Sequence, residues 1–144
     1  MSSFLSKSEI NQQAATLLKN NYMHCSSIHC SYYRCIQLML HIANNIFNTE
    51  KGYFDEMTKK DQSSTHAFLI KMFQKNLSEK KKNLQRIESL EFQKHIRSFN
   101  AITDLKKLRT DSDYSDLVIM KEHSEKGINI AESVTTALQK IYLQ

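Results

Sequence analysis

The sequence contains no proline and only two glycines, Gly52 and Gly127, among its 144 residues. β-Sandwiches, β-barrels and glycine-rich phosphate loops use these residues in their turns and backbone cradles. The shortage of both therefore argues against those folds and favours an all-α protein. A chain of this length is the size of one ordinary domain, which buries roughly two-thirds of its unfolded surface without disulfides or metal. We predict a single helical domain over residues 1–144.

Long apolar segments and a secretion signal are also missing. The longest apolar runs are a few residues, far below the roughly 20 that span a bilayer. The opening residues, MSSFLSKSEINQQ, lack the basic start and apolar centre of a secretory signal. Cys25, Cys30 and Cys35 are spaced by five residues, which on a helix points neighbouring thiols about 140° apart, so that they cannot pair within it. These features predict a cytoplasmic protein with reduced thiols and no membrane association.

The net charge of +5 is unevenly distributed. Residues 51–109 hold fourteen basic and seven acidic groups, whereas residues 110–144 hold three basic and six acidic groups. A basic middle segment suits a polyanion such as RNA, or self-association with the acidic tail, but a solvated helical surface is an equal alternative. The candidate RNA-binding residues are Lys80, Lys81, Lys82 and Arg86.

Hydrophobic periodicity predicts about five helices joined by short connections, hence an antiparallel bundle. The first helix begins near Ser6 or Ser8 and turns inward Ile10, Ala14, Leu17 and Leu18. The second has two adjoining apolar stripes, which make it the central helix. These stripes are Cys25, Ile28, Tyr32, Cys35, Met39, Ile42 and Ile46, and beside them Tyr33, Ile36, Leu40, Ala43 and Phe47. Its opposite, polar edge carries Ser27, Ser31, Arg34, Gln37 and His41.

The second half of the chain repeats this pattern less regularly. Residues 48–64 lose the helical period and predict a loop with one helical turn at 53–57. Ser64 or Thr65 caps a third helix, and the lysine-rich residues 78–82 lead into a long fourth helix ending near Arg109. After a polar connection at 110–116, a last helix runs over 117–143. Its inner stripe is Met120, Gly127, Ile130, Val134, Leu138 and Ile141.

The only metal candidate is the group His24, Cys25, His29 and Cys30. These side chains spread around a helix, whereas a zinc site needs three or four converging ligands. Cys25 and Cys35 also fit the core stripe, where a thiol packs as a small hydrophobe. A nucleophilic cysteine beside a histidine has no local signal to support it. We therefore predict no metal and no cofactor.

Several segments, taken in order, resemble the HEPN family of small helical bundles from prokaryotic toxin–antitoxin and defence systems. They cover residues 5 to 143, and the longest is the stretch from Ile102 to Ile141. The resembling pieces are His29-Cys30-Ser31-Tyr32-Tyr33, then Thr65-His66 followed by Phe68 and Phe73, and finally Arg109, Asp113, Tyr114 and Ala131. The resemblance implies a HEPN-like bundle that engages RNA, forms a homodimer, and pairs with a nucleotidyltransferase or another effector protein.

The family's ribonucleases combine an arginine with a histidine four to six residues later, for metal-independent cleavage through the RNA 2′-hydroxyl. Here Arg109 is followed at 114–116 by Tyr, Ser and Asp, so that Tyr114 stands nearest the histidine position. The resemblance makes Arg109, Asp113 and Tyr114 the candidate catalytic residues, with His66 as an auxiliary. The alternatives are structural: an Arg109–Asp113 ion pair, a buried Tyr114 ring, and a His66 that orients a helix start.

Overall fold

The computed structural model describes residues 3–47, 49, 52–61, 64–116 and 118–144. Over these residues the chain forms seven α-helices and no strand, so the predicted all-α bundle is confirmed. The helices are α1 (Ser3–Asn20), α2 (His24–Asn45), α3 (Tyr53–Asp61), α4 (Thr65–Lys82), α5 (Arg86–Asn100), α6 (Ile102–Tyr114) and α7 (Lys121–Tyr142).

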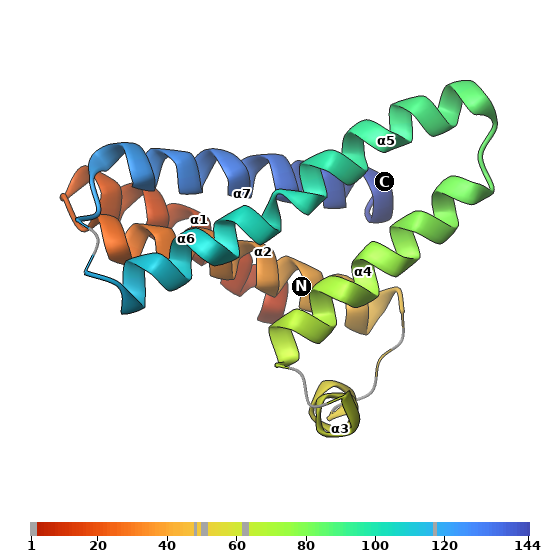
Figure 1. The fold of residues 1–144 in the computed structure, drawn as a ribbon, viewed down its shortest axis with the longest axis horizontal. Helices are drawn as coiled ribbons and strands as arrows, with labels where there is room; N and C mark the ends of the chain where they lie inside the picture. Colours follow the sequence, from red (N-terminus) through yellow and green to blue (C-terminus); the bar gives the residue numbers. More distant parts are fainter. Residues whose placement is uncertain (1–2, 48, 50–51, 62–63, 117) are drawn as a thin grey trace.

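The centre of the bundle is α2, which packs against α1, α6 and α7. Helices α2 and α7 run in the same direction, because His24 contacts Ser124 near their starts and Arg34 contacts Glu132 further along. Helix α6 runs antiparallel to α2 (Figure 1). Helices α4 and α5 form a hairpin whose tip projects from one end of the bundle, and α3 packs against α4 (Figure 1).

The core joins α2 to α4, α5, α6 and α7. Its largest fully buried aromatic side chains are Tyr32, Phe73 and Phe99. The Phe73 and Phe99 rings stack with centroids 5.9 Å apart, which connects the α4–α5 hairpin to the core. Gly127 is buried where α7 approaches α2, and a Cβ there would meet Ile28 at 3.6 Å. Its predicted place on the inner stripe is confirmed.

Several predicted boundaries were wrong. Part of the segment predicted as a loop is the nine-residue helix α3. The predicted long fourth helix is two helices, because the helix breaks at Ala101 without any glycine or proline. The lysine-rich residues 78–82, predicted to lead into that helix, are the last residues of α4. Helix α6 also extends through most of the predicted connection, and α7 begins only at Lys121.

The inward faces of α1 and α2 also differ from the prediction. Ile10 and Leu17 are exposed, and the side chains that α1 buries are instead Ser8 and Ala15. Ser27, Ser31 and Arg34 lie on the predicted polar edge of α2, yet they are buried. The reason is that α1 and α7 cover this edge, and small polar side chains there hydrogen-bond to the neighbouring backbone. In the predicted stripe of α2, Cys25 and Ile46 are exposed.

The predicted cap of α4 is confirmed, since the hydroxyl oxygen of Ser64 accepts a hydrogen bond from the backbone N–H of Ala67 at 3.1 Å. Among the helices of the described ranges, none combines the length and apolarity needed to cross a bilayer.

Candidate functional site

Three segments that are distant in the sequence meet on one side of α2. We call the group formed by Tyr32, Tyr33, His66 and Arg109 the arginine–tyrosine cluster. The two tyrosines come from α2, the histidine from the first turn of α4 and the arginine from the second half of α6. Each segment was singled out by the sequence, and the fold brings them together.

The Arg109 guanidinium lies against two aromatic rings. Its carbon Cζ is 5.0 Å from the centroid of Tyr32 and 5.9 Å from that of Tyr33, both within cation–π range. Its Nη1 is 3.5 Å from the Tyr33 hydroxyl, the outer limit of a hydrogen bond. Among the described residues Arg109 forms no ion pair with a carboxylate, and its buried Nε has no hydrogen-bond partner. The cluster therefore holds a cation without a counter-ion.

His66 is positioned by Tyr32. Its Nδ1 is 3.1 Å from the Tyr32 hydroxyl, and its ring lies edge-on to Tyr33 with centroids 5.5 Å apart. This contact holds the imidazole by one nitrogen, and within the described part of the chain Nε2 is left for a ligand or a proton. The orientation of a histidine through one nitrogen, with the other free to react, is the arrangement used by general bases.

The cluster shifts two titrations. Burial raises the pKa of Tyr32 to about 12, with the charge of Arg109 acting in the opposite direction. Burial also lowers the pKa of His66, and the positive charges of Arg109 and Lys106 lower it further. Both side chains are therefore neutral at pH 7. A neutral histidine beside a fixed cation can accept a proton, unlike one already charged.

His29 and Asp113 form the outer edge of the site. The Nδ1 of His29 is 3.5 Å from a carboxylate oxygen of Asp113, and its ring stacks at a tilt on Tyr33 with centroids 4.6 Å apart. In the described chain the Asp113 carboxylate therefore contacts His29 on α2. The Arg109–Asp113 pair predicted from their four-residue spacing is thus not the one formed.

The remaining predicted residues lie elsewhere. Tyr114, at the end of α6, is 80% exposed, so the alternative in which its ring is buried was wrong. Lys80, Lys81 and Lys82 end α4 at the hairpin tip, roughly 20 Å from His66 along a helix that rises about 1.5 Å per residue. Lys80 lies over the Tyr142 ring, and Lys81 donates a hydrogen bond to Gln93 at 2.6 Å. The basic tip is a separate surface from the cluster.

The candidate metal ligands and thiols do not form a site. His24 contacts Ser124 while His29 contacts Asp113, and no three His, Cys, Asp or Glu side chains of the described chain are close enough to share an ion. Cys25, Cys30 and Cys35 are unpaired thiols. Burial raises the pKa of Cys35 to about 12, which keeps it protonated and a poor nucleophile.

Sequence reasoning missed how much α2 contributes. His29 was considered as a metal ligand and as part of the resembling segment, and the two tyrosines as part of that segment and of the apolar stripes, but none of the three was predicted as a site residue. Their spacing of three and four residues places them on one helical face, and Arg109 and Asp113 share a face of α6 by the same rule. The helical period was therefore a usable signal, although it did not say that the two faces would meet.

Comparison with known proteins leaves the site to be interpreted from its geometry, because no family model, curated protein or solved structure matches the chain.

Proposed function

We propose that this chain is a HEPN-type helical module of a prokaryotic defence or toxin–antitoxin system, which acts in the cytoplasm and engages RNA through the arginine–tyrosine cluster. The observation that carries the proposal is the Arg109 guanidinium, which rests on two tyrosine rings with no carboxylate partner in the described chain. Arg109 is half-buried, and a guanidinium in such a place is stabilised when an anion binds it, because Nε and the terminal nitrogens are fixed donors.

Phosphate is the anion that suits this cluster best. A guanidinium donates to two phosphate oxygens at once, and the N–H of a neutral imidazole adds a third hydrogen bond without further charge. The exposed side of the cluster is edged by His29, which is 47% exposed, so a polymer could reach it. Lys106, which is close enough to lower the pKa of His66, adds positive charge around the same point.

Substitution of Arg109 tests the proposal. Binding of a fluorescent single-stranded RNA of about ten nucleotides, measured by anisotropy at low salt, should weaken at least tenfold in Arg109→Ala. The matched control is Arg97→Ala, which removes an equally charged, exposed side chain from α5. Equal binding by the wild type and Arg109→Ala would contradict the proposal.

The basic hairpin tip is proposed as a second, non-specific contact for longer RNA. Replacing Lys80, Lys81 and Lys82 by glutamate should weaken binding of long RNA and flatten its dependence on salt, because fewer counterions are then released. If the salt dependence of RNA binding were the same in this variant as in wild type, the tip would not be an RNA contact but an ordinary solvated surface.

A second candidate function is metal-independent RNA cleavage, and the position of His66 favours it. A histidine is missing after Arg109 in the sequence, and in this proposal His66 of α4 takes its role. In this reaction Nε2 of His66 takes the proton from the 2′-hydroxyl and the 2′-oxygen attacks phosphorus. The 5′-oxygen then leaves and takes a proton from water, which leaves a 2′,3′-cyclic phosphate, while Arg109 stabilises the charge on the phosphate.

Cleavage assays separate the two functions. An active enzyme should cleave RNA in EDTA, lose the activity in both His66→Gln and Arg109→Ala, and leave a strand with a 2′-deoxy linkage intact. An absence of cleavage by wild type, together with Arg109-dependent binding, would leave the RNA-binding module as the function.

The proposal includes assembly with a second subunit, because HEPN ribonucleases build one site from two arginine-bearing segments. A homodimer is the first choice, and a nucleotidyltransferase or effector protein is the alternative partner. The exposed Tyr114, Val118 and Met120 lie beside the end of α6 and are available to such a partner. Light scattering at micromolar concentrations should report twice the 16.8 kDa chain mass, and a constant monomer would contradict the homodimer.

A further inference from the structure

A cavity of about 220 Å³ lies between α1, α2 and α7. Its lining residues include Ala15, Thr16, Ser31, Arg34, Ala131 and Glu132. On α2, Ser31 and Arg34 point away from the face that carries His29 and Tyr33, since the helix turns about 100° per residue. The cavity is thus on the opposite side of α2 from the arginine–tyrosine cluster and belongs to a different site.

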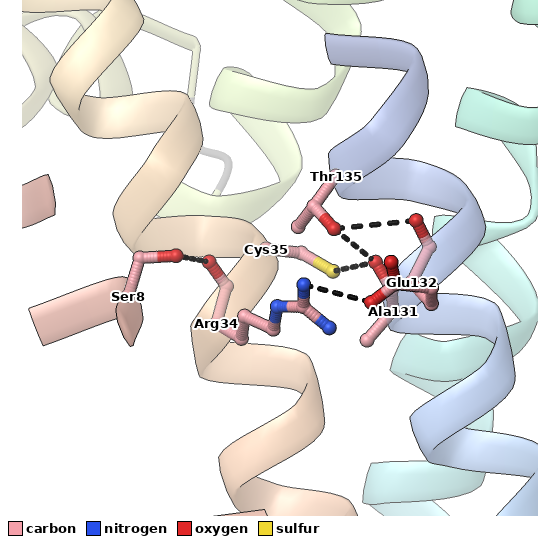
Figure 2. Close-up of polar contacts among 6 residues, drawn as sticks. All are labelled: Ser8, Arg34, Cys35, Ala131, Glu132 and Thr135. Atoms are coloured by element: carbon pink, nitrogen blue, oxygen red, sulfur yellow. Dashed lines mark hydrogen bonds and ion pairs between the residues drawn. The ribbon is translucent and has the colours of Figure 1, made fainter. Parts of the chain in front are cut away.

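The cavity is lined by polar side chains that can form further hydrogen bonds. The Arg34 side chain is only 10% exposed, and its Nη2 is 2.9 Å from a carboxylate oxygen of Glu132, which is 61% exposed. Figure 2 shows this arginine reaching from α2 to α7, where one terminal nitrogen contacts Glu132. Ser31 is 1% exposed, and among the described residues its buried hydroxyl has no hydrogen-bond partner. A buried, unpaired hydroxyl is destabilising unless a ligand or water satisfies it.

The charges restrict which ligand fits. A simple anion would approach Arg34 next to the carboxylate of Glu132 and be repelled. A simple cation would meet the guanidinium in the same way. A neutral ligand that offers hydrogen-bond donors to Glu132 and acceptors to Arg34 satisfies both groups without adding charge.

Size and shape restrict it further. A cavity of roughly 150 Å³ holds benzene, so about 220 Å³ holds a somewhat larger ring system. The apolar wall contains Ala15 and Ala131, whose small side chains leave space between α1 and α7. Planar rings with polar edges meet both conditions, and nucleobases are the common biological examples.

We propose that this cavity binds a guanine base. Guanine carries the donors N1–H and N2–H₂ on one edge, which match the two acceptor oxygens of Glu132. Its O6 and N7 are acceptors, which match the guanidinium of Arg34, the commonest reader of these atoms. Adenine would place its N1 acceptor against the carboxylate and lose this match. The base comes either from a guanosine in RNA or from a free guanine nucleoside or nucleotide, and its recognition does not depend on the Arg109 cluster.

Titration with guanosine tests the proposal, because a nucleoside has no phosphate to bind Arg109. Followed by NMR chemical shifts of the full chain, guanosine should bind at least tenfold more tightly than adenosine. Glu132→Gln, which replaces one acceptor by a donor, should reduce guanosine affinity at least tenfold and leave adenosine unchanged. The matched control Glu122→Gln removes an exposed carboxylate from the first turn of the same helix and should bind guanosine like wild type.

A second variant tests the cavity independently, in case Glu132→Gln reduces guanosine binding by disturbing the fold. Thr16 is at the exposed rim of the cavity, so Thr16→Tyr should block guanosine while the helical circular dichroism stays unchanged. Short RNAs that differ only by guanine or adenine at one position identify the source: a preference for the guanine strand assigns the site to RNA, and tighter binding of the free nucleoside assigns it to small molecules. Equal affinity for guanosine and adenosine, no binding of either, or unaltered binding in both variants would overturn the proposal.

Discussion

Two arginines lie on opposite sides of α2, and their surroundings differ. Arg34 reaches from α2 to a carboxylate on α7 at 2.9 Å, close to hydrogen bonds made by Ser8 and Thr135 (Figure 2). Arg109 reaches from α6 to two tyrosine rings, and its charge helps to lower the pKa of His66. One guanidinium is thus neutralised inside the protein, while the other keeps its full charge for a ligand.

The difference indicates which ligand each side of α2 accepts. An arginine paired with glutamate presents donors and acceptors together, which suits a neutral polar ring. An arginine supported by aromatic faces and a tyrosine hydroxyl attracts anions, because these groups stabilise the cation without cancelling its charge. The sequence around each arginine does not show which ligand it attracts, since the neighbours that decide this ligand come from other helices.

The largest predicted effect concerns the free energy of unfolding on the Arg34 side. Glu132→Ala leaves a nearly buried guanidinium without its counter-ion and should destabilise the fold by about 2 kcal/mol, less than a fully buried pair because the carboxylate is partly solvated. Arg109→Ala removes an unpaired cation and should lower stability by about 1 kcal/mol or less. Urea denaturation of both variants measures the difference. A larger loss for Arg109→Ala would reverse the assigned roles.

A smaller effect is expected within the cluster. Tyr32→Phe retains the buried ring but removes the hydroxyl that contacts His66 at 3.1 Å, and it should reduce stability by about 1 kcal/mol. Tyr33→Phe removes a hydroxyl whose contact with Arg109 is long, at 3.5 Å, so its effect should be smaller still. Thermal unfolding of the two single variants compares them directly. Equal losses would mean that Tyr32 does not position His66.

The smallest predicted effect is a dependence of stability on pH. Because the pKa of His66 is lowered in the folded protein, the unfolded chain binds more protons as pH falls below about 6.5. Stability from this residue is complete above that pH and is lost as pH falls toward the lowered pKa. His66→Gln should therefore show a shallower decline of melting temperature between pH 7 and 5. Identical slopes in the variant and wild type would exclude this contribution.

The sequence predicted most of the local structure and little of how helices meet. The 3–4 spacing from Ile28 to Ile42 identified the buried face of α2, and Ser64 identified the start of α4. The packing of α1 could not be read in the same way. Ser8 and Ala15 are buried in place of Ile10 and Leu17, because Ser8 donates to the carbonyl of Arg34 and Ala15 accepts from Ser27. Such tertiary hydrogen bonds leave no periodic signal.

The candidate site could also be predicted only in part, because its residues were recognisable in the sequence but the meeting of their helices was not. Arg109 and His66 were recognisable as motif residues. They lie 43 positions apart in the sequence, and their approach depends on α4 and α6 meeting the same face of α2. The break at Ala101 contains no proline or glycine, so the sequence did not predict it. This break lets α6 lie along α2, while α5 lies in the projecting hairpin (Figure 1).

The most direct test of the central claim, that the cluster binds an RNA phosphate, is an NMR titration of the His66 imidazole with pH. In the free protein His66 should titrate below the ordinary histidine pKa of about 6.5. Addition of a short 2′-deoxy oligonucleotide, which cannot be cleaved, should raise that pKa, because a phosphate on Arg109 favours the charged imidazole. The ring signals of His95, on α5, should not move on this addition. An unchanged titration of His66, or an equal rise in Arg109→Ala, would contradict the account.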